Sequence, residues 1–325
     1  MSAAPERAGG ISIRRYTPED RPILATAVEQ ARAASEFRGS SDKDGAFFLR
    51  IIEMTGNPLA IALDPDVAVA GFASPDVKLT WVRQDLRRRG IGRRLLEAAT
   101  GIERERGRPE VLMGLDPLDG GGRAFLESTG FGYHSTLWDL ALPRGNRVAP
   151  PVWPDGLRAR PLEWERDKRA WQALFNAAFA DHATPMEISD EILAAPPDPN
   201  IEDADMILVE DADGALVGFC ATTPERERGR VGHRGEIWTV GVLPTRQGHG
   251  LGRQLLRWGV LRLRSIGVSD VVLSVNGRNS RALGLYESEG FVRTATRERW
   301  ARPVEAAAGA AAGAAAGATR DADAE

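Results

Sequence analysis

The sequence predicts an α/β fold in which two tandem domains each carry a central mixed sheet flanked by helices. The first observation is an internal repeat, because "VRQDLRRRGIGRRLL" at residues 82–96 matches "VLPTRQGHGLGRQLL" at residues 242–256 with a constant offset of 160. The register persists thirty residues later, where "FLESTGF" falls on "LYESEGF". Self-similarity of this length indicates a duplicated structural unit. The second observation is the succession of strand, glycine turn, helix and strand, which is the order of a parallel crossover unit.

The second copy shows its elements most clearly. "MILVEDADGALVGFCAT" predicts a hairpin, because Asp213-Gly214 favours a tight turn between two apolar runs. "GEIWTVGV" and "DVVLSV" have the β-branched content of strands, and the leucine spacing of "RQLLRWGVLRLRS" predicts a helix between them. Around these we expect a first strand in "GLRARPL", a further helix in "SRALGLYESEG" and a closing strand in "FVRTATRERW".

The repeat sets the predicted domain boundaries. We expect an N-terminal domain at residues 11–142 and a C-terminal domain at residues 157–302. The segment between them, 143–156, is rich in turn formers and is predicted to be a linker. Residues 1–10 and the Ala/Gly-rich tail 303–325 are predicted to be disordered. The tail has too few apolar residues to span a membrane.

Composition excludes several classes of function. The chain has 325 residues, of which 42% are hydrophobic, and this is enough for two ordinary cores. Its formal charge of -4 gives no basic excess for nucleic acid, and no signal or membrane segment is evident, so we expect a cytoplasmic protein, monomeric or weakly dimeric. One cysteine, Cys220, and four scattered histidines predict neither a disulfide nor a metal site.

The glycine turn predicts a phosphate site, because glycines admit a ligand close to the backbone and a helix start presents unpaired N–H groups. It lacks the lysine and hydroxyl of a P-loop, and Arg253 stands where a dinucleotide fingerprint needs its third glycine. The pattern that fits is [RQ]-x-x-G-x-G directly after a strand. It is formed by Gln247, Gly250 and Gly252 in the second copy and by Arg87, Gly90 and Gly92 in the first.

"RQGHGLG" after "TVGVLP", followed by "NGRNSRALGLYESEGF", resembles the GCN5-related N-acetyltransferases (GNAT), which bind acetyl-CoA and acetylate an amine. The resemblance covers nearly the whole second copy and, more weakly, the first. It implies that the diphosphate of coenzyme A contacts backbone N–H groups of the turn and that pantetheine lies along the preceding strand. The residues implied are Val240, Gly241, Val242, Gln247, Gly248, His249, Gly250, Leu251, Gly252, Arg253 and Asn279. Asn279 has a second interpretation as a helix N-cap, and both can hold.

The same resemblance implies Glu236 as the base that deprotonates the amine and Tyr286 as the acid that protonates the leaving thiolate. The alternatives are a solvated charge at a strand end for Glu236 and a packed ring for Tyr286. By reference pKa values, proton donation from a phenol to a thiolate is uphill by about 2 kcal/mol. We interpret the second copy as the catalytic domain.

The first copy differs at the matching positions. It has Leu126 in place of Tyr286, Asp119 in place of Asn279 and Asp76 in place of Glu236. We therefore expect it to perform no chemistry and to bind acetyl-CoA weakly or not at all, through Val82, Arg87, Gly90 and Gly92, while forming a wall of the acceptor cleft.

The tandem arrangement is similar to that of the mycothiol synthases, but it departs from them where the acceptor is read. Where those enzymes supply a glutamate and a lysine, this chain has "HATPM" at residues 182–186 and "CATT" at residues 220–223. We expect a small-molecule primary amine as acceptor. The alternatives are the mycothiol synthase reaction itself, acetylation of proteins or peptides, and a non-catalytic sensor of acyl-CoA.

Overall fold

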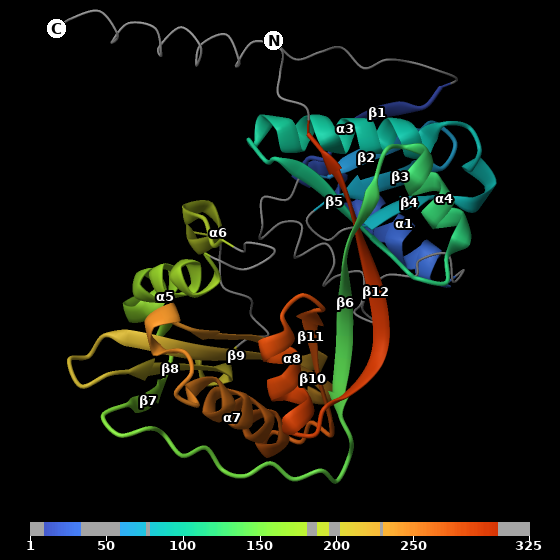
Figure 1. Cartoon of the computed structure of the whole chain (residues 1–325). Coiled ribbons are helices and arrows are strands. Elements are labelled where there is room, and N and C mark those ends of the chain that lie inside the picture. The colour runs from blue at the N-terminus through green and yellow to red at the C-terminus, as the bar shows by residue number, and fades with distance from the viewer. Residues whose placement is uncertain are drawn as a thin grey trace, which may run out of the picture. The chain divides into compact units, whose positions relative to one another are not determined.

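The computed structural model describes residues 10–33, 59–75, 79–180, 187–194, 202–227 and 230–304. The chain forms two compact units (Figure 1). Unit 1 comprises residues 1–134 and 297–325, and unit 2 comprises residues 135–296. No helix in the described part of the chain is long and apolar enough to cross a membrane.

Unit 2 contains most of the second repeat. Its elements are β7 (Arg158–Pro161), α5 (Trp164–Phe179), α6 (Asp190–Ala194), β8 (Met206–Glu210), β9 (Leu216–Glu227), β10 (Arg230–Val242), α7 (Leu251–Ser265), β11 (Asp270–Asn276) and α8 (Ser280–Ser288), with most of β6 (Gly132–Leu142) and the start of β12 (Val292–Pro303). The strand order in the unit is β12, β6, β11, β10, β9, β8, β7. The β10–β11 pair is parallel, as a crossover through α7 requires. The predicted hairpin turn is confirmed, with Gly214 at φ +80°.

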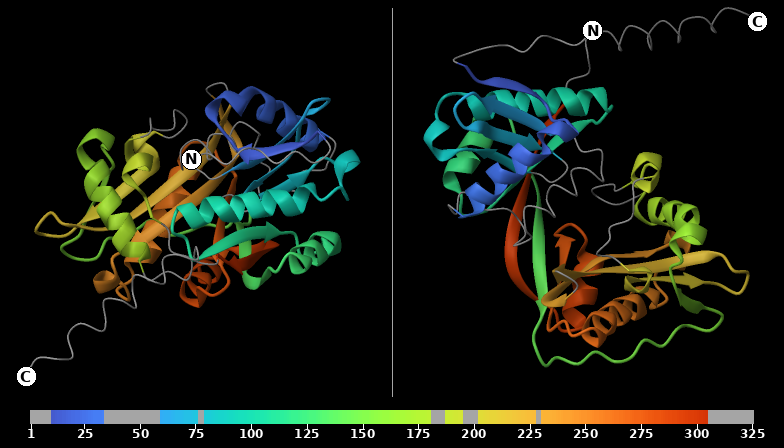
Figure 2. Two further views of the ribbon diagram at one scale, coloured as in Figure 1. Left: turned by 90° about the horizontal axis from the view of Figure 1, so that it is seen from above. Right: turned by 180° about the vertical axis from the view of Figure 1, so that it is seen from behind.

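Helices cover both faces of this sheet (Figures 1 and 2). Leu255, Leu256 and Val260 of α7 are fully buried against one face, which we call the α7 face, and residues of α8 pack on the same core. Trp171, Leu174 and Phe175 of α5 pack on the opposite face, the α5 face, together with residues of α6. The apolar spacing of α7 therefore supports the helix predicted from its leucines.

Unit 1 repeats this layering. Its elements are β1 (Ser12–Arg15), α1 (Arg21–Ala33), β2 (Ala60–Asp64), β3 (Ala68–Ser74), β4 (Leu79–Val82), α3 (Ile91–Glu105), β5 (Glu110–Leu115) and α4 (Gly120–Ser128). Strands β1 to β4 pair in sequence order, and β5 pairs with β12. One core is formed with α3 and α4 and the other with α1.

The closing strands are exchanged between the repeats. Residues 137–142 of β6, from the first repeat, pair with β11 of the second. Residues 298–303 of β12, from the second repeat, pair with β5 of the first. Leu140 and Leu142 are buried in the unit 2 core, and Trp300 is buried in the unit 1 core. The compact units therefore depart from the expected domains 11–142 and 157–302 at these two strands. Because both strands expose alternating faces, their own sequences do not specify which repeat they complete.

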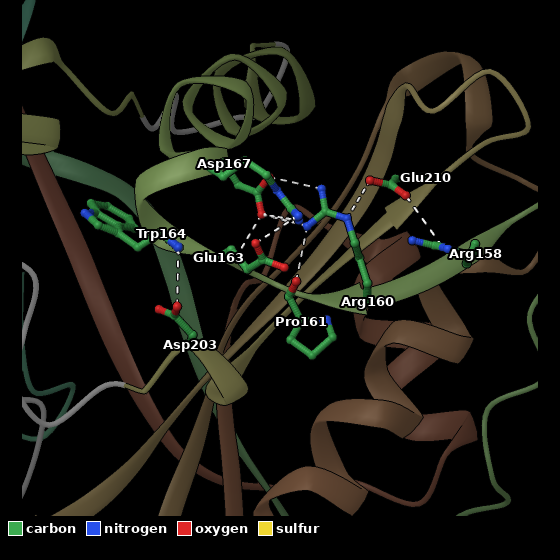
Figure 3. Close-up of polar contacts among 9 residues, drawn as sticks. Arg158, Arg160, Pro161, Glu163, Trp164, Asp167, Asp203 and Glu210 are labelled. Atoms are coloured by element: carbon green, nitrogen blue, oxygen red, sulfur yellow. Dashed lines mark hydrogen bonds and ion pairs between the residues drawn. The ribbon is translucent and has the colours of Figure 1, made fainter.

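A forked ion pair joins the first strand to the first helix of each repeat. In unit 2, Arg160 on β7 donates to both carboxylate oxygens of Asp167 at 2.6 and 3.1 Å and to Glu210 on β8 at 2.5 Å (Figure 3). The backbone N–H of Glu163 also donates to Asp167, at 2.8 Å, at the start of α5. Arg14 and Asp20 form the equivalent fork in unit 1, at 2.7 and 2.6 Å.

The environment of Asp167 favours its charged form. Burial alone would raise its pKa, but hydrogen bonds from Arg160, Arg166 and the backbone outweigh burial and hold the pKa well below its usual value. A depressed carboxyl pKa stabilises the folded state above the unfolded-state pKa of about 4. This contribution is lost as the pH falls through the folded-state value.

We expect Asp167→Asn to lower the free energy of unfolding at pH 7 by roughly 3 kcal/mol, since it removes one of the two carboxylates that pair with the largely buried Arg160. Denaturant unfolding at pH 7 and below pH 4 measures the effect. The difference between wild type and variant should shrink at the lower pH. Asp190→Asn, which removes an exposed ion pair with Arg169, is the control and should change little. A deficit independent of pH would contradict this account.

Candidate active site

Strands β10 and β11 pair over only three residues. The parallel ladder joins residues 234–236 to residues 270–272, although β10 continues to Val242 and β11 to Asn276. Beyond Glu236 the backbone of β10 therefore keeps its β9 partner on one side and leaves the ladder with β11 on the other. The carboxyl end of parallel strands is where open α/β sheets bind ligands. The end of this ladder is accordingly the candidate site.

A β-bulge lies next to the end of the ladder, between Ile237 and Thr239. Ile237 faces the α7 core, and after the bulge Val240 and Val242 face it, so one extra residue has changed the alternation. The bulged residue, Trp238, is 47% exposed, and its ring stacks on Phe175 of α5 at 6.2 Å and 22°. Trp238 was not among the site residues predicted from the sequence. In the sequence, its one distinguishing feature is an aromatic residue at a position of "GEIWTVGV" that strand alternation places on the same side as Glu236.

Glu236 lies on the α5 face, because its neighbours Gly235 and Ile237 both face the α7 core. Glu236 is paired with Thr223 of β9 and Val272 of β11. The hydroxyl of Thr223 is buried and makes no hydrogen bond within the described part of the chain. Thr223 thus belongs to the immediate surroundings of the proposed base. Residues 182–186 and Asp76 lie outside the described residues.

The glycine turn leads from β10 into α7. Gly248 and Gly250 have φ values of +88° and +82°, which L side chains rarely adopt, and Gly250 is the N-cap of α7. Since no side chain caps this helix, its first amides are directed outward without a capping oxygen. The Gln247 side-chain amide donates to the Val242 carbonyl at 3.0 Å and accepts from Arg281 at 2.6 Å. Gln247 therefore holds the shape of the turn.

Gly252, in the first turn of α7, has no structural need to be glycine. A methyl group there would meet its nearest neighbours, Leu285 and Val242, at 3.8 and 3.9 Å, which is ordinary contact. The space above Gly252 fits a ligand that approaches the helix backbone closely. The Arg253 side chain is bound to Glu289, which also accepts from Arg257 at 2.8 Å, and the Arg253 backbone N–H donates to the Gly250 carbonyl at 3.1 Å.

The first repeat forms a turn of the same shape. Arg87 donates to the Val82 carbonyl at 2.9 Å, as Gln247 does to Val242, and Gly90 has φ +77°. Above Gly92, however, a methyl group would lie only 3.0 Å from the ring of Phe125. An aromatic ring therefore packs closely over this glycine in unit 1, whereas the matching glycine of unit 2 has room for a methyl group.

Tyr286 of α8 packs beside the α7 core, with its ring 6.2 Å from that of Phe291. Its hydroxyl makes no hydrogen bond to any described residue. Burial, with a smaller effect from Cys220, raises the pKa of Tyr286 to about 12. The phenol therefore keeps its proton at neutral pH. In the first repeat, Leu126 is 4% exposed and belongs to the core.

Asn279 is the N-cap of α8, and its side-chain oxygen accepts from the N–H of Ala282 at 3.0 Å. Asp119 caps α4 in the same way, accepting from Gly122 at 2.8 Å. The N-cap interpretation of Asn279 is confirmed. Within the described residues, no group of three or more His, Cys, Asp or Glu side chains could hold a metal ion.

Comparison with known proteins identifies relatives along most of the chain. Residues 160–291 match the Acetyltransferase (GNAT) family. A mycothiol acetyltransferase of Thermobispora bispora is 34% identical over 288 residues, covering 86% of this chain and 95% of that protein. One of Kytococcus sedentarius is 35% identical over 301 residues, covering 90% and 97%.

Solved structures share the fold. A GCN5-related N-acetyltransferase from Sphaerobacter thermophilus has a TM-score of 0.63 at 21% identity, with 92% of this chain and 97% of that chain covered. A tandem GNAT protein from the clavulanic acid biosynthesis pathway has a TM-score of 0.62 at 16% identity, with 91% and 99% covered. The tandem architecture predicted from the repeat is therefore confirmed.

Two glycine substitutions should separate the needs of the fold from those of a ligand. Gly250→Ala forces an L side chain into φ +82° and should destabilise the protein by roughly 1–2 kcal/mol. Gly252→Ala lies inside a helix with room for its methyl group, so it should leave stability unchanged or raise it by up to about 1 kcal/mol. If coenzyme A lies against the start of α7, the added methyl group of Gly252→Ala should weaken its binding. Unfolding curves, with calorimetric titration of coenzyme A, measure both effects, and a Gly252→Ala protein with unaltered affinity would exclude close contact there.

Proposed function

Because this acyl-CoA-dependent acetyltransferase belongs to the acetyltransferase (GNAT) family, we propose that its second repeat acetylates a primary amine of a small molecule, with Glu236 as base and Tyr286 as acid. The observation that carries this assignment is the contrast between the repeats. They share the glycine turn, but only the second combines room for a methyl group above the glycine in its first helical turn with a protonated phenol. Both features are needed for a thioester to bind and react.

The proposed cofactor site uses backbone groups. The uncapped start of α7 supplies N–H groups and the positive end of a helix dipole to the diphosphate of coenzyme A. Gly248, Gly250 and Gly252 keep side chains away from it. The pantetheine arm pairs with residues 240–242 as an added strand, on the side where β10 has left the ladder with β11. An N–H of the same segment polarises the acetyl carbonyl.

The proposed acid and base come from opposite faces of β10. Glu236 lies on the α5 face, and Tyr286 packs on the α7 face. A thioester held between the diverging strands would have Glu236 on one side and Tyr286 on the other. The amine arrives as an ammonium with a reference pKa of about 10.4, and Glu236 takes its proton directly or through water. The nitrogen then forms a bond to the carbonyl carbon, the C–S bond breaks, and the hydroxyl of Tyr286 protonates the sulfur. The second proton that the nitrogen loses as it becomes an amide passes to solvent, from which the Tyr286 phenolate recovers its proton.

The high pKa of Tyr286 constrains the order of events. With a phenol pKa of about 12 and a reference thiol pKa of about 8.5, complete proton transfer to a free thiolate is uphill by about 5 kcal/mol. This exceeds the cost expected from reference values, because the ring is buried. Proton donation therefore has to accompany C–S cleavage, when negative charge is still developing on the sulfur.

We propose only the chemical class of the acceptor, a primary amine of a small molecule. The second candidate is the acceptor used by mycothiol acetyltransferases, favoured by identities of 34% and 35% to two such enzymes. Against it, this chain has "CATT" at residues 220–223, where the mycothiol synthases supply a lysine. Acetyl-CoA consumption with amino sugars, amino acids, polyamines and peptides tests the class. Consumption with peptides alone would support a protein acetyltransferase. Tight coenzyme A binding without turnover would support a sensor.

We expect Tyr286→Phe to lower kcat by about 10²- to 10⁴-fold, because the ring remains while its proton is lost. Leu126→Tyr, at the matching position of the first repeat, should leave kcat unchanged. Steady-state kinetics with the best amine of the panel measures both. Full activity of the Tyr286→Phe enzyme would remove the phenol from the mechanism.

Glu236→Gln should show a loss that depends on pH. Near neutrality the variant cannot take the ammonium proton, so kcat/KM should fall by about 10²- to 10⁴-fold. The deficit should shrink as the pH approaches about 10, where the amine arrives already neutral. Glu287→Gln, at an exposed ion pair with Arg293, is the matched control. A deficit of equal size at every pH would assign Glu236 a purely structural role.

A further inference from the structure

The exchanged strand β6 places an acidic residue of the first repeat on the proposed acceptor face of unit 2. Asp139 pairs with Ser274 of β11, and the Ser274 hydroxyl donates to its carboxylate at 2.7 Å. Leu140 and Leu273, next to them along their strands, face the α7 core. Strand alternation therefore directs Asp139 and Ser274 to the α5 face, where Glu236 lies.

The strand register gives the separation of the two carboxylates. Glu236, Val272 and Ala141 lie in one row across β10, β11 and β6. Asp139 lies in the row of Ser274, which is two residues after Val272 toward the carboxyl end of β11. Two strand spacings and one such step put the Cα atoms of Glu236 and Asp139 roughly 12 Å apart. Asp139 thus lies just beyond the point where the β10–β11 ladder ends.

Three further observations indicate a face built for a polar ligand. Trp238 exposes 47% of its surface here, although it stacks on Phe175, and offers an apolar platform. Thr223, beside Glu236, has a buried hydroxyl that makes no hydrogen bond within the described residues. Asp139 is only partly buried, so part of its surface is accessible to a ligand.

We propose that Asp139, positioned by Ser274, is a specificity residue for the acceptor: it binds a hydrogen-bond donor of the substrate roughly 10 Å from the nitrogen that is acetylated. This inference rests on the function proposed above. The donor is a hydroxyl or a second ammonium group. By this assignment the first repeat contributes to the reaction through its closing strand, although its own turn is filled by Phe125.

The test compares Asp139→Asn with wild type on matched amines. The panel contains a short primary amine with no second donor, an amino sugar glycoside with distal hydroxyls, and a linear polyamine with a distal ammonium. Loss of a hydrogen bond to a charged group should raise KM for a donor-bearing amine about 10-fold or more. The kcat with that amine, the KM for acetyl-CoA and all constants with the short amine should stay within about 2-fold. A response confined to the amino sugar identifies a hydroxyl donor, and one confined to the polyamine identifies an ammonium.

Two controls isolate the effect of position. Asp155→Asn removes the same charge from an exposed turn of the linker and should change nothing. Ser274→Ala, which frees the carboxylate to rotate, should raise the same KM by a smaller factor. It also serves as the test if Asp139→Asn does not fold, as judged by its melting curve.

The possible failures are distinguishable. Equal losses with short and donor-bearing amines would mean that Asp139 only supports the sheet, and no loss with either would mean that it does not contact the acceptor. Both results overturn this inference while leaving the acetyltransferase assignment intact. A wild-type protein that acetylates no amine would overturn the proposed function and the Asp139 subsite together.

Discussion

The short parallel ladder between β10 and β11 is the constraint on which the site depends. Its three residue pairs are held tightly under α7, because a methyl group on Gly235 would lie 2.7 Å from Leu263. Immediately afterwards the bulge at Trp238 shifts the strand by one residue, and the two strands separate. A longer ladder would satisfy the backbone of residues 240–242 with β11 and leave no place for an added strand. The close packing at Gly235 therefore fixes where the sheet opens.

Strand exchange determines what borders that opening. The sheet of unit 2 continues beyond β11 into β6, so one side of the proposed acceptor face is made by the first repeat. In exchange, β12 brings Trp300 and Arg302 to the unit 1 core, where Arg302 donates to the Thr129 carbonyl at 2.8 Å. Each repeat therefore needs the other to complete its core.

Local chemistry accounts for what the sequence could predict. The glycine turn, the Asp213-Gly214 hairpin and the N-cap at Asn279 were predictable because each depends on a few adjacent residues: glycine at positive φ, or a short polar side chain at a helix start. The strand exchange was not, because the closing strands carry similar alternation and their partners are distant in sequence. The bulge was not predictable either, because "GEIWTVGV" is an uninterrupted strand pattern. The one extra residue of the bulge changes which of the following side chains face the α7 core and which face α5.

The two repeats show that the shape of the turn does not depend on the residue that begins its motif. Arg87 and Gln247 differ in charge and shape, yet each donates to the carbonyl of the valine five residues before it. The turn is thus a structural feature that survives this substitution. What differs is the residue that packs above the glycine in the first turn of the helix: an added methyl group would lie 3.0 Å from Phe125 in unit 1 but 3.8 Å from Leu285 in unit 2. On the function proposed above, the residue that packs above the helix start, and not the glycines alone, decides whether coenzyme A binds.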